Sequence, residues 1–169
     1  MPAEDDRPDK PKAAPEKESV VAFLDYHRAT LISKVRGLTK EQATRRLVPS
    51  ETTLLGIMKH LAHVEAWWFQ DNFAGRDVPD YPWSDDDPDA DFRIEPDESV
   101  ESIVALYESK IEASRAIVEP ASLDELSVRA PRGTQRSLRW IVLHMIEETA
   151  RHVGHADILR ELTDGATGE

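Results

Sequence analysis

Four segments of this chain carry apolar residues at helical spacing, and a glycine or proline closes each of them. The segments are residues 17–37, 52–74, 97–119 and 137–162. Apolar positions that recur three and four residues apart line one side of a helix. No stretch alternates as a half-buried strand does, and no segment repeats another. The sequence therefore predicts an all-α fold, a four-helix bundle with long connections at residues 76–97 and 120–136.

The composition changes at both ends of this region. Residues 1–16 hold four prolines and mostly charged side chains, which predicts a disordered leader. We expect the bundle over residues 17–163 and a flexible tail over residues 164–169. Between the first two long helices, Thr39 and Gln42 have the spacing of a capping box, which predicts a short helical turn.

The first long connection is strongly acidic, with nine acidic residues between positions 77 and 97. Asp87, Asp89 and Asp91 resemble part of a calcium loop, but Phe92 replaces the glycine that such a loop needs for its turn. We therefore expect a solvated acidic loop.

The composition also excludes several classes of function. The chain has no cysteine, so any thiol chemistry needs a thiol from outside. Its formal charge of −12 argues against nucleic-acid binding. No apolar run approaches the roughly 20 residues of a membrane span, and the N-terminus lacks the apolar core of a signal peptide. We expect a cytoplasmic protein with no nucleic-acid or membrane partner.

Five of the 6 histidines fall into two patches. His60 and His63 belong to the segment at residues 52–74. In the segment at residues 137–162, His144, Glu148, His152 and His155 follow one another at spacings of 4, 4 and 3 residues. Such spacings place side chains along one side of a helix, where a carboxylate and an imidazole one turn apart can bind the same metal ion.

A helical wheel selects among these candidates. With about 100° per residue, His152 lies roughly 40° and Glu148 roughly 80° from the centre of the apolar face, while His144 and His155 lie nearer its polar edge. On the wheel of residues 52–74, His60 flanks the apolar face. Burying a lone carboxylate is costly, and a divalent cation offsets that cost. We predict a metal site of His60, Glu148 and His152, a donor set that suits zinc, nickel or iron(II).

Simpler interpretations remain open for each residue taken singly. A lone helical histidine usually makes a local hydrogen bond or faces solvent, and Glu148 can instead pair with Arg139 or Arg151. Glu65 lies at the centre of the apolar face of its helix, so it needs a partner. That partner is an arginine, a metal-bound histidine or the metal itself.

Further residues are candidates for roles around the metal. Glu65 and His155 are candidates for orienting a ligand or relaying a proton. Trp67 and Trp140 border the histidine patches in the sequence, and both are candidates for the wall of a substrate pocket. The histidines His63 and His144 are further candidates for that wall.

Two motifs resemble those of the DinB/YfiT-like metalloenzyme superfamily, whose members are four-helix bundles. One runs from Leu55 through His60 to Trp68, and the other runs from His144 to Arg160. The resemblance covers about residues 18–162. It implies that His60 is a metal ligand and that two further ligands, here Glu148 and His152, lie one turn apart on the last helix.

Many members of that superfamily use three histidines, whereas this chain has Glu148 at the middle position. The His/Glu/His set resembles the branch that contains mycothiol-dependent enzymes. The resemblance therefore implies a metal-dependent enzyme, with Zn²⁺ rather than Ni²⁺ or Fe²⁺ expected. This enzyme would activate an external low-molecular-weight thiol such as mycothiol and transfer it to a small electrophile.

Two other functions keep the same ligands. One is a non-catalytic stress or binding protein, a dimeric helical bundle whose metal only stabilises the core. The other is a hydrolase in which metal-activated water replaces the thiol. In the leading interpretation the partners are a small-molecule substrate and a second copy of the chain in a homodimer.

Overall fold

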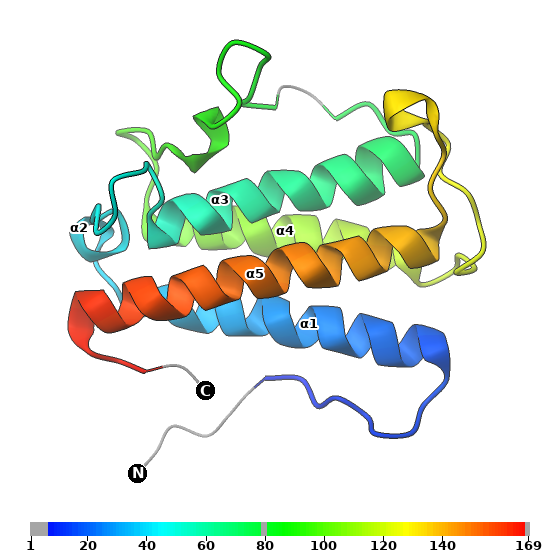
Figure 1. Cartoon of the computed structure of the whole chain (residues 1–169), viewed down its shortest axis with the longest axis horizontal. Coiled ribbons are helices and arrows are strands. Elements are labelled where there is room, and N and C mark those ends of the chain that lie inside the picture. The colour runs from blue at the N-terminus through cyan, green and yellow to red at the C-terminus, as the bar shows by residue number, and fades with distance from the viewer. Residues whose placement is uncertain (1–6, 79–80, 168–169) are drawn as a thin grey trace.

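The computed structural model describes residues 7–78 and 81–167, and within them the fold is all-α, as predicted (Figure 1). Its four long helices are α1 (Glu16–Val35), α3 (Leu54–Glu65), α4 (Val100–Val118) and α5 (Leu138–Asp164). The short helix α2 (Lys40–Ala43) lies between α1 and α3. The predictions for residues 1–6 and 168–169 lie outside the described residues.

The four long helices form two packed pairs. α1 packs chiefly on α5, and α3 packs chiefly on α4. Within each pair the helices run in the same direction, and the two pairs run in opposite directions (Figure 1). Ion pairs agree with this arrangement, because Glu16 and Lys34 near the two ends of α1 pair with Arg139 and Asp157 near the corresponding ends of α5. Since α3 and α4 are parallel, the chain between them must return along the length of the bundle.

The helix ends follow local sequence signals. Thr39 and Gln42 form the predicted capping box at α2, with Gln42 N donating to Thr39 Oγ1 at 3.2 Å and Thr39 N donating to Gln42 Oε1 at 3.0 Å. Ser137 accepts from Trp140 N at the start of α5. The helix predicted from about residue 97 begins later, at Val100, because Ser99 caps it.

One helix changes its winding. The segment predicted as a single helix over residues 52–74 is α-helical only as far as Glu65. It continues as a π-helix, η1 (Ala66–Phe73), which carries Trp67 and Trp68. The apolar spacing of the sequence is compatible with either winding, so the sequence pattern did not distinguish them. π-helical turns occur frequently at functional sites.

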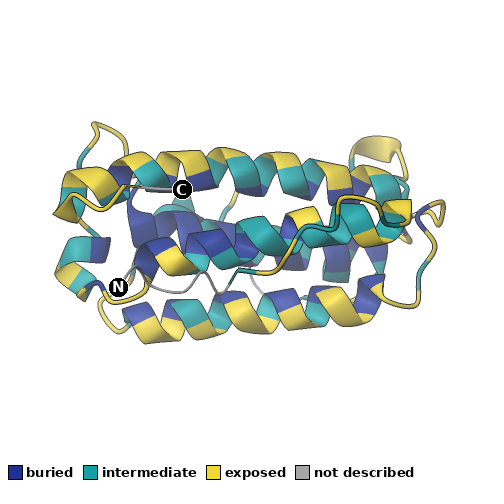
Figure 2. Cartoon of the chain, turned by 90° about the horizontal axis from the view of Figure 1, so that it is seen from below, coloured by how far each residue is buried: buried dark blue, intermediate teal, exposed yellow. Residues whose placement is uncertain are grey.

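The core lies between the helix pairs (Figure 2). The helices α1, α4 and α5 turn their apolar sides inward and expose their outer sides, whereas every residue of α3 is buried or partly buried. Leu31, Leu55, Met58 and Tyr107 are among the completely buried side chains. None of the described helices is both long enough and apolar enough to cross a membrane.

Candidate metal centre

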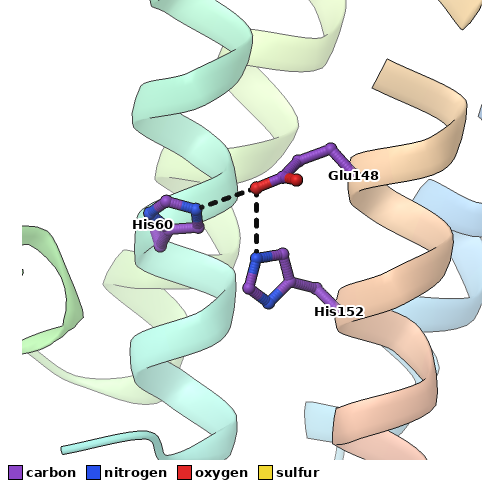
Figure 3. A group of neighbouring side chains, drawn as sticks. All are labelled: His60, Glu148 and His152. Atoms are coloured by element: carbon purple, nitrogen blue, oxygen red, sulfur yellow. Dashed lines mark hydrogen bonds and ion pairs between the residues drawn. The ribbon is translucent and has the colours of Figure 1, made fainter. Parts of the chain in front are cut away.

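His60, Glu148 and His152 converge between α3 and α5 (Figure 3). His152 Nε2 lies 3.2 Å from Glu148 Oε1, and His60 Nε2 lies 3.4 Å from the same oxygen. One ligand atom from each residue lies within 4.8 Å of the other two. Both imidazoles therefore present Nε2 to one carboxylate oxygen.

The helices account for this convergence. Glu148 and His152 are one turn apart on α5, so they lie on the same side of it. His60 reaches them from α3, and α3 packs on α5. All three side chains are partly buried, with exposed fractions of 17% for His60, 18% for Glu148 and 12% for His152. The ligand atoms are thus accessible on one side and supported by the bundle on the other.

A fourth residue, Asp91, was not among the predicted candidates. Its Oδ2 lies 2.7 Å from His60 Nδ1, and Asp91 is only 1% exposed. The ring of Phe92 stacks on that of His60 at a centroid distance of 4.3 Å. The prediction of a solvated acidic loop is therefore wrong for Asp91, although Asp85, Asp86 and Asp89 are exposed as expected.

Asp91 belongs to a short 3-10 helix, η2 (Ala90–Phe92), which packs on the first turns of α3. Gly56 permits this approach, because a Cβ at that position would collide with the carbonyl oxygen of Phe92. Lys59 fixes the following residues, since its Nζ donates to the Arg93 carbonyl at 2.8 Å and pairs with Glu98 at 2.8 Å. Contacts on the same side of α3 therefore position η2 beside His60.

The charges of the site are strongly coupled. Burial of the His60 ring lowers its pKa, but hydrogen bonds to Asp91 and Glu148 raise it by more, to about 9. Hydrogen bonds with His152 and His60 hold the pKa of Glu148 well below its usual range. A carboxylate that remains ionised between two imidazoles attracts a cation, and a divalent metal ion can take the place of a proton on His60 Nε2.

The donor set fits a divalent metal ion. Two imidazole nitrogens and a carboxylate oxygen form a common zinc set with a position left open for water or substrate. Asp91 Oδ2 accepts a hydrogen bond from His60 Nδ1–H, which keeps the proton on Nδ1 and leaves the lone pair of Nε2 for the metal. Of the alternatives open for Glu148, Arg139 pairs instead with Glu16 and Asp124. Arg151 does pair with Glu148, but its Nη1 lies 3.8 Å from Oε2, which leaves Oε1 to the two imidazoles.

The two residues predicted to relay protons or orient a ligand lie outside this cluster. Glu65 is completely buried, and its two carboxylate oxygens accept from Arg28 Nε and Nη2 at 2.7 Å each. Of the three partners left open for Glu65, the structure shows the arginine. His155 is exposed, and its ring lies edge-on to that of His152 at 5.5 Å.

A cavity of about 690 Å³ opens beside His60 and Glu148. All four tryptophans of the chain line it, and Trp140 stacks on His144 at 5.1 Å with the ring planes 13° apart. Trp67, Trp140 and His144, three of the candidates for the wall of a substrate pocket, line this cavity. His63, which was also a candidate, is not among the lining residues, and its ring lies edge-on to those of Tyr81 and Trp83.

Sequence reasoning missed several residues of this cavity. They are Trp68, Trp83, Asp91, Arg132 and Arg136. A signal was present for Asp91, since Ala90 and Phe92 flank it with apolar side chains within an otherwise polar acidic run. No comparable signal marks the two arginines, which come from an irregular segment.

Comparisons with known proteins agree with the fold and the motifs. A family model described as Mycothiol-S-transferase matches residues 19–165. A crystal structure of a conserved protein from Enterococcus faecalis superimposes with a TM-score of 0.66 at 15% sequence identity, covering 91% of this chain and 100% of that chain. At this identity the likeness concerns the fold alone. No curated protein matched the chain.

Proposed function

This chain belongs to the mycothiol-S-transferase family, and we propose that it transfers an external low-molecular-weight thiol, mycothiol in the first place, to a small electrophile. The proposal includes a divalent metal ion, Zn²⁺, held by His60, Glu148 and His152. The observation that carries it is that two residues of this donor set, His60 and Glu148, line an aromatic cavity.

The chain itself contains no cysteine thiol, so the sulfur nucleophile of this reaction must come from the external low-molecular-weight thiol. In the transfer, the thiol sulfur forms a bond to an electrophilic carbon, the bond from that carbon to its leaving group breaks, and the thiol proton departs with the leaving group. Zinc bound at this site would lower the pKa of the coordinated thiol and so supply a nucleophile at neutral pH.

The residues of the chain organise the reactants. Asp91 fixes the tautomer and orientation of His60. Glu148 supplies one negative charge between the two imidazoles. The tryptophan walls offer flat apolar surfaces that exclude water and hold the acceptor close to the thiol.

The test measures metal content and transfer in the same set of variants. Purified protein is loaded with zinc, and conjugation of mycothiol to 1-chloro-2,4-dinitrobenzene is followed, with glutathione and a thiol-free reaction for comparison. We expect Glu148→Ala and His152→Ala to lose stoichiometric zinc and to lower conjugation at least about 100-fold.

Glu147→Ala is the matched control, because Glu147 is the neighbouring glutamate on α5 and pairs with Arg151 on the exposed side. It should retain both zinc and activity. Stoichiometric zinc in both Glu148→Ala and His152→Ala would overturn the ligand assignment. Zinc binding without conjugation of any thiol would overturn the transferase.

A further inference from the structure

Two arginines on the wall of the cavity have no acidic partner. Arg132 and Arg136 line the cavity, and within the described part of the chain neither forms an ion pair with a carboxylate. Their neighbours in sequence differ, because Arg129 pairs with Asp71 and Asp77. Arg139 pairs likewise with two carboxylates, those of Glu16 and Asp124. The chain has 33 acidic residues. Even so, of the four arginines between positions 129 and 139, the two that line the cavity are the two without a carboxylate partner.

A row of side chains runs along α5 from Arg136 towards the candidate metal centre. The Arg136 guanidinium lies 5.1 Å from the centroid of the Trp140 ring, and Trp140 stacks on His144. Trp140, His144 and Glu148 follow at intervals of one turn on α5. The rise of a helix places the start of α5 about 15 Å from Glu148. The cavity therefore has an arginine end, an aromatic middle and a metal end.

The backbone of Arg132 is also unusual. Its φ of 56° and ψ of 32° lie in the left-handed region. Among the described residues, no other residue except glycine has a positive φ. Glycine or asparagine is usual in this conformation, because a Cβ is disfavoured there. Strain of this kind clusters at functional sites. The position thus carries a cationic side chain where glycine would suit the backbone better.

The amide groups at the start of α5 do not compete for an anion in this region. Leu138 N donates to Glu125 O, and Arg139 N donates to Leu123 O. Trp140 N donates to the Ser137 side chain. An anion at this end of the cavity would therefore be bound by the arginine side chains, whose guanidinium groups suit a planar carboxylate.

We propose that Arg132 and Arg136 bind a carboxylate of the acceptor molecule, so that the enzyme selects acceptors with an apolar planar body and an anionic end directed away from the metal. This inference rests on the proposed function, because it takes the cavity as the acceptor site. It adds the charge of the acceptor and the two residues that recognise it.

The test uses intrinsic tryptophan fluorescence, since every tryptophan of the chain lines this cavity. Zinc-loaded protein is titrated with 4-chlorobenzoate and with 4-chlorobenzamide, two probes of the same shape that differ in charge. We expect wild type to bind the carboxylate about tenfold more tightly than the amide, the gain of one charge-assisted hydrogen-bonding contact. In Arg132→Gln/Arg136→Gln this preference should fall below about twofold.

Arg45→Gln/Arg46→Gln is the control for net charge, because both arginines are exposed and likewise lack an ion pair with a described residue but do not line the cavity. It should keep the full preference. Arg132→Gly is a second variant that removes the cation while relieving the backbone. We expect it to melt at the same or a higher temperature than wild type and to lose part of the preference.

A preference that persists in the double variant would mean that the carboxylate binds the metal, and it would overturn the proposal. No preference in wild type would overturn it as well. The titration needs no thiol, so its result is separate from that of the transfer assay. If the arginine-dependent preference is found but no thiol is transferred, the proposed reaction is contradicted and the carboxylate site is supported. If thiol is transferred but the preference is absent, only the proposed carboxylate site is contradicted.

Discussion

Asp91 determines how His60 presents its ring to the candidate metal centre. Its carboxylate is buried and bonded to Nδ1, so the opposite nitrogen, Nε2, faces Glu148. A carboxylate in this position both orients the imidazole and increases its basicity. The role of Asp91 is one of positioning, since it contacts a ligand and does not itself join the ligand cluster.

Replacing Asp91 by asparagine tests this role. We expect Asp91→Asn to weaken zinc affinity about 10- to 100-fold while the protein stays folded, because the amide cannot hold the Nδ1 proton with the charge of a carboxylate. Competition with a chromophoric chelator measures the affinity, and circular dichroism checks the fold. Asp89→Asn is the control, since Asp89 is exposed two residues away. Equal zinc affinity in the Asp91 and Asp89 variants would contradict the positioning role.

His63 provides a pH-dependent signal separate from the metal ligands. Burial of the ring lowers the pKa of His63 from 6.5 to about 4. Nearby charged groups have smaller effects, some raising and some lowering this pKa. As the pH falls below 6.5, the unfolded chain takes up this proton before the folded protein does. Stability is therefore unaffected by His63 above pH 7 and decreases as the pH falls from 6.5 towards 4.

We expect His63→Gln to lose less stability than wild type between pH 7 and pH 4.5. Urea unfolding at both pH values measures the difference, and all carboxylates common to the two proteins cancel in the comparison. The ring resonances of His63 should titrate near pH 4 in wild type. The same loss of stability in both proteins would show that His63 is solvated.

Residues on regular helices could be predicted from the sequence, whereas those on irregular segments could not. Glu148 and His152 were found because one turn of helix fixes their relation, whatever surrounds them. Asp91 is 31 positions from its partner His60 and reaches it only because the connection folds back along the bundle. No periodic pattern encodes that return. The same reason explains why Arg132 and Arg136 were missed.

At the scale of elements, the pair of Arg28 and Glu65 joins α1 to α3. Both side chains are almost fully buried, and two hydrogen bonds of 2.7 Å connect them. Arg28 also pairs with Asp25 at 2.8 Å. The sequence showed that Glu65 lies on the apolar face but not which element supplies its partner, because a wheel describes one helix at a time.

Glu65→Gln should destabilise the bundle without affecting the metal. Removing the charge of Glu65 leaves the buried guanidinium without one of its two carboxylates, and breaking a buried pair in this way costs about 3 kcal/mol. Urea unfolding measures this loss in zinc-free protein, so that the metal does not contribute. Zinc affinity should stay within about twofold of wild type. A large fall in zinc affinity would contradict this expectation. It would instead support the alternative, left open by the sequence, that Glu65 contacts the metal or a metal-bound histidine.

At the scale of the whole molecule, the candidate metal centre lies between the two helix pairs. His60 belongs to the pair of α3 and α4, and Glu148 and His152 belong to the pair of α1 and α5. The number of helices and their inward faces could be predicted, because amphipathic spacing survives any arrangement of the bundle. The parallel directions within each pair depend on the long connection, whose course the sequence does not specify.

Because the centre joins the two pairs, a bound metal should stabilise the entire bundle. A ligand that binds only the folded state adds RT ln(1 + [L]/Kd), or about 4 kcal/mol when the free metal is 1,000 times its Kd. We expect the melting temperature to fall by several degrees when a chelator removes zinc from wild type, and to recover when zinc is restored.

His152→Ala should melt at the same temperature with and without zinc, because its site has lost a ligand from α5. His155→Ala, which changes the exposed histidine one turn away, should keep the full response. A zinc response that survives in His152→Ala would place the stabilising ion elsewhere in the protein.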